Sequence, residues 1–250
     1  HYVMEACAEQ QIPVLVLDRP NPNGHYVDGP VLKPAFSSFI GMHPVALVHG
    51  MTMAEYAGMI NGEGWLANGI KCELSWIPVK NYTRSTIYHL PVDPSPNLQD
   101  MHAIYLYPSA CLLEGTIASV GRGTDYPFRL IGHPKVKTGD TVFVPRSIPG
   151  KSERPKLMGE NCNGWRLDGM SPDGSSMLDS LDITWLLKIY SETGAGKDFF
   201  TSSFNLLAGT DELKKQIIRG DDVLSIRQSW KSELEEFKKV RRRYLIYDDN

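Results

Sequence analysis

The chain has 250 residues, of which 42% are hydrophobic and 22% are charged, with a formal net charge of -3 at pH 7. This length can bury a sizeable core in one large domain or in one and a half ordinary ones. The near-neutral balance excludes an electrostatic affinity for nucleic acid or an anionic membrane, so we expect the partner to be a small molecule or a polymer that is recognised locally.

The chain starts with HYVMEACAEQ, a pattern that predicts the last turns of an amphipathic helix. This segment lacks the basic region and apolar core of a secretion signal, and no apolar run approaches the roughly 18 residues that span a bilayer. Since the chain opens in the middle of a helix, we expect it to be truncated, with any targeting signal lying upstream.

Three short runs predict the strands of a parallel sheet. Residues 12–17 are continuously apolar, which is typical of a strand covered on both faces, and residues 44–48 and 70–74 supply the next two strands. A helix is expected after Thr52, because Glu55 three residues later completes a capping box. The alternation of strands and helices predicts an α/β fold built on a Rossmann-like parallel sheet.

The pattern becomes less regular after residue 90. The segment PVDPSPN, residues 91–97, holds too many prolines for a helix or a strand, whereas residues 100–116 predict a helix with Pro108 opening a second one. Further strands are expected at 117–120, 128–131, 142–145 and 165–167, and further helices at 183–194 and 223–244.

The pattern of predicted strands and helices changes near residue 135, which indicates a domain boundary. We predict a Rossmann-like α/β domain over residues 1–134 and a smaller C-terminal α+β domain over residues 135–250. The four cysteines are far apart in the sequence, and buried thiols are favoured over two disulfides.

Several motifs resemble known sites but lack a required residue. GAGKD, residues 194–198, lacks the first glycine and the hydroxyl residue of a phosphate-binding loop, and Tyr126 replaces the third glycine of a dinucleotide motif that starts at Gly121. The histidines show no zinc-ligand spacing, so we expect neither a cofactor nor a metal. The basic run at residues 238–243 predicts a solvated helix end rather than a nucleic-acid site.

Polar side chains follow the three predicted strands, in residues 18–30, 49–55 and 75–82, which a parallel sheet would place side by side at its ligand-binding edge. The carboxylates Glu114 and Glu55 are the candidate catalytic residues, because carboxylates serve as acids and bases. Amide, arginine and aromatic side chains around them are typical of a carbohydrate site. The candidate substrate-binding residues are Asp18, Arg19, Asn21, Asp28, His49, Trp76, Asn97 and Arg122.

A structural role remains open for each of these residues. Glu55 completes the capping box, Asp18 is suited to a turn, and Trp76 is suited to a core. Glu114 differs, because a carboxylate at the C-terminal end of a helix opposes the helix dipole, which favours a functional role. Arg122 is available to hold Glu114 or a neighbouring carbonyl.

Taken together and in order, the motifs of this chain resemble the DUF1343 family, which includes the NamZ-type exo-β-N-acetylmuramidases. The resemblance extends over essentially the whole chain. The motifs that carry it include DRPNP at residues 18–22, HGMT at 49–52 with Glu55, PSPN at 94–97, EGT at 114–116 and SVGRGT at 119–124.

The resemblance implies a Rossmann-like domain, a smaller C-terminal domain and an active cleft between them. It implies a glycoside hydrolase that releases terminal β-1,4-linked N-acetylmuramic acid from the non-reducing end of peptidoglycan fragments. The expected partners are peptidoglycan-derived saccharides, and the expected location is periplasmic or secreted. The lactyl carboxylate of the sugar requires a cation such as Arg19 or Arg122, and the N-acetyl group requires an amide such as Asn21 or Asn97.

This chain departs from the family at His25, Asp28 and Val48, and it lacks an upstream Glu-His-Gly-Phe motif whose glutamate is a leading acid/base candidate. The missing glutamate leaves a second function open, a muropeptide- or amino-sugar-binding module without turnover. A third is a hydrolase that acts on another acidic amino sugar.

Overall fold

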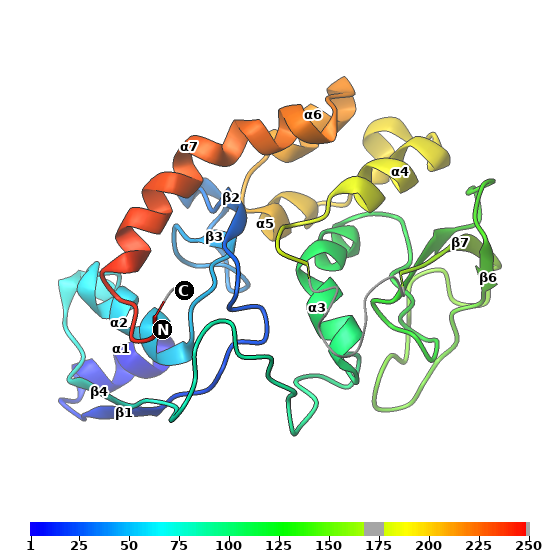
Figure 1. Cartoon of the computed structure of the whole chain (residues 1–250). Helices are drawn as coiled ribbons and strands as arrows, with labels where there is room; N and C mark the ends of the chain where they lie inside the picture. Colours follow the sequence, from blue (N-terminus) through cyan, green and yellow to red (C-terminus); the bar gives the residue numbers. More distant parts are fainter. Residues whose placement is uncertain (168–177, 249–250) are drawn as a thin grey trace.

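The structure, a computed structural model, describes residues 1–167 and 178–248 of the chain. Within these residues, small sheets and the helices around them form two parts that lie side by side (Figure 1). One part holds the N-terminal segment and the other holds the middle of the chain. The last helix runs back over the first part, so both termini lie there (Figure 1).

Seven α-helices and four 3-10 helices occur in the described ranges, and most of them are short. The α-helices are α1 Tyr2–Glu9, α2 Met53–Gly62, α3 Met101–Ala110, α4 Thr184–Thr193, α5 Phe204–Ala208, α6 Glu212–Arg219 and α7 Val223–Arg242. The 3-10 helices are η1 Pro34–Phe36, η2 Ala67–Gly69, η3 Cys111–Gly115 and η4 Gly196–Phe199. The strands are β1 Val14–Leu17, β2 Asp28–Val31, β3 Ala46–Val48, β4 Leu74–Ile77, β5 Leu130–His133, β6 Thr141–Phe143 and β7 Cys162–Arg166.

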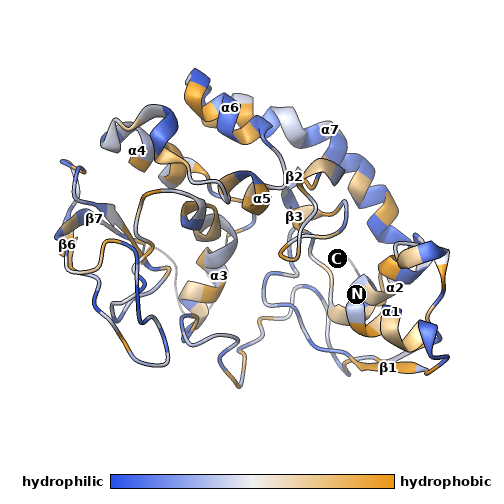
Figure 2. Ribbon diagram, turned by 180° about the vertical axis from the view of Figure 1, so that it is seen from behind, coloured by the Kyte–Doolittle hydropathy of each residue, from blue (hydrophilic) through white to orange (hydrophobic). Residues whose placement is uncertain are grey.

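The expected mixed α/β fold with a parallel sheet is confirmed, and β1 and β4 form the parallel pair. Val14 and Val16 face a small core that α1 and α2 complete. The alternate residues Leu15 and Leu17 are 56% and 66% exposed, so the prediction of a strand covered on both faces is wrong for the described chain. Figure 2 shows β1 as a hydrophobic strand at the margin of the molecule.

The strand predicted at residues 44–48 does not join this parallel pair. It forms β3, which pairs antiparallel with β2, because the chain turns back after residue 31 and returns beside itself. The third predicted strand begins later than expected, so Trp76 lies inside β4 rather than beyond its end. The three polar segments therefore do not share one edge of a single sheet, contrary to the prediction.

The helix that leads to Glu114 differs in detail from the prediction. Asp100 caps α3 by accepting a hydrogen bond from the Ala103 amide (2.8 Å), and Pro108 lies inside α3 instead of opening a new helix. The chain then tightens into η3, where a Cβ on Gly115 would lie 2.6 Å from the Cα of Phe204. Glycine is required there because the backbone of α5 packs directly against this turn.

The C-terminal half supplies most of the helices. The predicted helices at 183–194 and 223–244 are confirmed as α4, which ends at the left-handed Gly194, and as α7. The sequence analysis missed α5 and α6. Buried residues of α7 form the predicted stripe, and this helix packs against β2, which returns the end of the chain to the N-terminal segment.

The main core extends across the predicted domain boundary. Tyr105 precedes residue 134, while Leu186 and Trp230 follow it, and all three belong to one cluster of buried side chains. The division into residues 1–134 and 135–250 stays a prediction.

Among the helices of the described residues, none combines the length and apolar character that a membrane crossing requires. All four cysteines are free thiols, and Cys72 and Cys162 are buried.

Candidate functional site

A pocket of about 530 Å³ lies between the N-terminal segment and the η3 turn. Its walls come from residues 30–56 on one side and from residues 107–114 and 206–209 on the other. This volume lies within the range of small-molecule sites. Of the described residues that line it, Glu114 is the one carboxylate, and the other polar or reactive side chains are His43, His49, Tyr56, Tyr107 and Cys111.

Glu114 is held at the pocket wall by two cations. Its Oε1 accepts a hydrogen bond from Nε of Arg122 at 2.7 Å, and its side chain is 26% exposed. Nζ of Lys156 donates to the backbone carbonyls of Glu114, at 3.2 Å, and Thr116. Burial lowers the pKa of Lys156, and the Glu114 carboxylate partly offsets this effect. Of the two partners left open for Arg122, the geometry shows Glu114.

His49 lies in the opposite wall as a neutral side chain. Burial, reinforced by the nearby Arg241 guanidinium, lowers the pKa of His49 to about 4. Its Nδ1 accepts a hydrogen bond from the Met51 amide at 3.1 Å, which places the proton of the neutral ring on Nε2. The ring stacks on Tyr56 with centroids 5.2 Å apart. His49 can therefore donate one hydrogen bond to a ligand near pH 7.

Two arginines fix the backbone of the turn that carries His49. Arg241 donates to the carbonyls of His49 at 2.9 Å and of Gly50 at 2.8 Å, and Nη1 of Arg84 also donates to the Gly50 carbonyl. Arg241 is 2% exposed, so the basic run at 238–243 is not wholly the solvated helix end that the sequence predicts. Buried backbone carbonyls need donors, and this turn receives them from distant parts of the chain.

The lowered pKa of His49 predicts a loss of stability in mild acid. The unfolded chain binds a proton below pH 6.5, whereas the folded chain stays neutral until about pH 4, so the free energy of unfolding should fall as the pH drops through this window. Protonation of this one group should lower the free energy of unfolding by about 3 kcal/mol between pH 6.5 and 4. Below the folded pKa the effect stays constant. In urea denaturation, the free energy of unfolding should fall less between pH 7 and 4 in His49→Gln than in the wild type. The same substitution at the exposed His89 should leave the decrease unchanged. Identical slopes for both variants would contradict the assignment.

Glu55 lies in the interior, away from the solvent-facing wall of the pocket. It is fully buried, and its side chain forms an ion pair with Arg84 and accepts hydrogen bonds from the amides of Thr52 and Ile246, each at 2.9 Å, and of Tyr247 at 3.3 Å. The capping box with Thr52 is confirmed. With these donors already bound, the surroundings of Glu55 support a structural role and do not support the catalytic role expected for it.

The polar side chains of residues 18–28 fasten the loop to the rest of the protein. Asp18 accepts hydrogen bonds from the Ala54 amide at 3.0 Å and from the hydroxyl of Tyr247 at 2.7 Å. Asn21 donates to the carbonyl of Met51 at 3.0 Å and accepts from the amide of Asn23. Both side chains are bound to protein groups, and neither lines the pocket that holds Glu114.

Asp28 is a buried junction between the two parts of the chain. It forms an ion pair with Arg227 at 2.8 Å and accepts hydrogen bonds from the amide of Leu181 and Nε1 of Trp230. A buried carboxylate needs such partners. These contacts give Asp28 a structural role in holding the chain together, and they explain its burial without a sugar contact.

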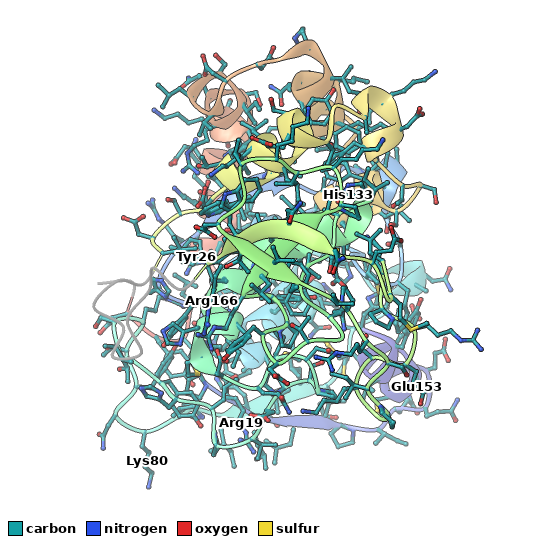
Figure 3. The ribbon with its side chains drawn as sticks, turned by 90° about the vertical axis from the view of Figure 1, so that its right-hand side faces the viewer. Arg19, Tyr26, Lys80, His133, Glu153 and Arg166 are labelled. Carbon is teal, nitrogen blue, oxygen red and sulfur yellow. The ribbon has the colours of Figure 1, made fainter. Side chains whose placement is uncertain are left out.

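Three predicted residues lie apart from Glu114. Arg19 is exposed beside the end of β1 (Figure 3), and Trp76 is 43% exposed on β4. Asn97 is buried and donates from Nδ2 to the carbonyl of Lys151 at 2.9 Å. The pocket therefore unites Glu114 with His49, and with Arg122 through its ion pair, but not with the remaining predicted contacts.

Sequence reasoning missed Lys156, Arg84 and Arg241. Lys156 follows a proline in an irregular basic segment, and Arg84 lies in another irregular segment, so no periodic pattern indicates what either contacts. The position of Arg241 on the α7 stripe is the one available signal, because an arginine that continues an apolar stripe is directed at the core. No group of three or more His, Cys, Asp or Glu side chains in the described ranges is arranged to hold a metal ion.

Comparison with known proteins gives a consistent result over the whole chain. The family model for the N-terminal part of exo-β-N-acetylmuramidase NamZ matches residues 1–102, and the model for its C-terminal part matches residues 105–247. The peptidoglycan β-N-acetylmuramidase NamZ of Bacillus subtilis (strain 168) is 35% identical over 262 residues, covering 98% of this chain and 62% of that protein. This chain thus spans less than two thirds of the length of that relative.

Two solved structures of DUF1343 family proteins from Bacteroides fragilis NCTC 9343 share the fold. The first has a TM-score of 0.93 and 45% identity, and the alignment covers 99% of this chain and 70% of that one. The second has a TM-score of 0.81 and 22% identity, with 98% and 69% covered. The pocket around Glu114 lies where the regions matched by the two family models meet in space.

Proposed function

This chain belongs to the exo-β-N-acetylmuramidase NamZ family, and from that premise we propose that the protein is a glycoside hydrolase acting on peptidoglycan fragments. The reaction proposed is the release of terminal β-1,4-linked N-acetylmuramic acid from the non-reducing end. The observation that carries the proposal is the Glu114–Arg122 ion pair in the wall of a pocket of about 530 Å³ formed by both family regions.

The surroundings of Glu114 define its part in the reaction. A carboxylate that accepts a hydrogen bond from a guanidinium is suited to act as a base, a nucleophile or an electrostatic partner of an oxocarbenium-like sugar. The Arg122 and Lys156 cations near it are suited to the lactyl carboxylate that distinguishes muramic acid from glucosamine. His49 supplies a neutral N–H donor from the opposite wall for a sugar hydroxyl or acetamido oxygen.

The substrate class also supports a location. Peptidoglycan fragments arise outside the cytoplasmic membrane, so we propose a periplasmic or secreted protein that takes part in cell-wall turnover and recycling. The Bacillus subtilis relative is a peptidoglycan β-N-acetylmuramidase, which supports the substrate class.

The proposal is tested by incubating the protein with the disaccharide in which N-acetylmuramic acid is β-1,4-linked to N-acetylglucosamine. We expect both free sugars to appear, and we expect no release from the disaccharide of reversed order, in which N-acetylglucosamine is terminal. Mass spectrometry of the products distinguishes the two. Equal release from both disaccharides, or release from neither, would count against the proposed activity.

One observation favours a second function, which is binding without turnover. Glycosidases usually place two carboxyl groups about the scissile bond, and Glu114 is the one carboxylate among the described residues that line the pocket. Calorimetry separates the two functions, since a binding module would take up the terminal muramic disaccharide and leave it intact.

A further inference from the structure

A second and larger pocket, of about 900 Å³, lies on the C-terminal part of the protein. The 123–126 turn, strand β6 and the 144–148 segment line it, together with Arg166 at the end of β7. Figure 3 views this side of the molecule, with Arg166 and His133 at opposite ends of the strand pair β5–β7. Nothing in the proposed reaction at Glu114 uses this pocket, which we call the arginine groove.

The arginine groove combines an apolar floor from β6 and its neighbours with two arginines, one carboxylate and several hydroxyl groups. Arg146 is exposed, and within the described residues its guanidinium has no hydrogen-bond or ion-pair partner. The guanidinium of Arg166 lies over the ring of Tyr126, 3.9 Å from its centroid, and that of Arg129 lies 5.4 Å from the same centroid, so the edge of the ring is the part available to a ligand. Asp125 is the carboxylate of the lining, and hydroxyl groups are supplied by Thr124, Thr141 and Ser147.

The arginine groove is joined rigidly to the Glu114 pocket. Arg122, which pairs with Glu114, is followed directly by Gly123 in the groove wall. The carbonyl of Gly123 accepts a hydrogen bond from the Arg146 amide at 2.8 Å, and a Cβ at Gly123 would lie 2.5 Å from the Arg146 carbonyl oxygen. Lys156, which bonds to the Glu114 backbone, follows further along the same irregular stretch of chain. The same short turn therefore positions both sites.

We propose that the arginine groove binds a carboxylate on the part of the peptidoglycan fragment that remains after the terminal sugar is removed. Arg146 is the principal contact, and Tyr126 with the hydroxyl groups contacts the sugar ring beside it. An arginine without a protein partner is suited to a carboxylate, which it can bind through two parallel hydrogen bonds. The identity of the ligand rests on the proposed function, whereas the preference for an acidic saccharide rests on the groove itself.

Two parts of a peptidoglycan fragment can supply this carboxylate. One is the lactyl group of the next muramic acid along the glycan, and the other is a carboxylate of a stem peptide. Calorimetric titration, carried out in a Glu114→Gln background so that the glycan is not cleaved, distinguishes them with three probes. These are a peptide-free tetrasaccharide of alternating N-acetylmuramic acid and N-acetylglucosamine, the same glycan with its lactyl carboxylates amidated, and a glycan that carries the stem peptide on amidated lactyl groups.

The test compares Arg146→Gln with Arg154→Gln, which removes the same charge from an exposed arginine of the same segment outside the groove. We expect Arg146→Gln to weaken binding of the tetrasaccharide on the order of tenfold, as for loss of a hydrogen bond to a charged group, while Arg154→Gln leaves it unchanged. Arg146→Lys should restore part of the affinity. Unchanged urea denaturation midpoints would show that the variants remain folded.

The outcomes separate this inference from the proposed function. Wild-type affinity of Arg146→Gln for every acidic probe would overturn the inference, even if the terminal sugar is still released. Loss of affinity in Arg146→Gln without any sugar release from the wild type would leave the arginine groove established and reject the hydrolase. Equal weakening by both glutamine variants would show a diffuse charge effect, which also overturns the inference.

Discussion

Replacing Glu114 with glutamine is expected to lower the rate of N-acetylmuramic acid release by about 10²- to 10⁴-fold, the range for loss of an acid/base group. The amide keeps the size of the side chain but removes the negative charge that pairs with Arg122 at 2.7 Å. The measurement is kcat and KM on a chromogenic β-N-acetylmuramide. Because the change removes a transition-state interaction, the decrease should appear in kcat and in kcat/KM alike.

The matched control for this prediction is Glu153→Gln. Glu153, labelled in Figure 3, is an exposed carboxylate. It does not line the Glu114 pocket, so the same chemical change there should leave kcat within the error of the wild type. Wild-type kcat in the Glu114 variant would exclude this residue from the chemistry and direct attention to another carboxylate.

Replacing Arg84 with methionine is expected to lower the free energy of unfolding by about 3–5 kcal/mol. The change leaves the Glu55 carboxylate fully buried without its guanidinium, and it removes a donor from the Gly50 carbonyl. The coupled effect on the His49 turn should raise KM as well. Urea denaturation, monitored by circular dichroism, measures the free energy of unfolding directly.

The exposed ion pair between Lys33 and Glu233 provides the comparison. Both side chains are more than two fifths exposed, at 42% and 47%, so Lys33→Met should cost at most about 1 kcal/mol. The double variant Arg84→Met with Glu55→Gln should recover part of the loss, because it removes the unpaired charge and keeps one side-chain oxygen that accepts from the amide of Ile246 or of Thr52. Similar small losses for Arg84→Met and Lys33→Met would mean that the buried pair contributes no more than a surface pair.

Local patterns in the sequence predicted the local structure well. The capping box of Thr52 and Glu55, the helix that ends at Gly194 and the apolar stripe of α7 were all readable, because each depends on residues a few positions apart. The pairing of strands was not readable in this way. Residues 44–48 pair antiparallel with residues 28–31, and no short-range signal distinguishes that partner from β1.

The same limit applies to the candidate site. Glu114 and Arg122 were readable as a pair because they lie eight residues apart. In contrast, the partners of Asp18 and Glu55 lie about two hundred residues further along the chain, at Tyr247 and Ile246. A carboxylate that follows a strand looks the same in sequence whether it will bind a sugar or a distant backbone amide, so the sequence alone does not distinguish these two roles.

These long-range partners have a consequence for the order in which the protein is assembled on the ribosome. Asp18 and Glu55 emerge early, but the Tyr247 hydroxyl and the Ile246 amide that bind them are among the last described groups to be synthesised. Until then, each carboxylate has only its earlier partners, which are Arg84 and the Thr52 amide for Glu55 and the Ala54 amide for Asp18. Native contacts of such long sequence separation slow folding. The N-terminal part should therefore reach its final form only after translation has passed residue 247, as a translation-arrest series probed by proteolysis can show.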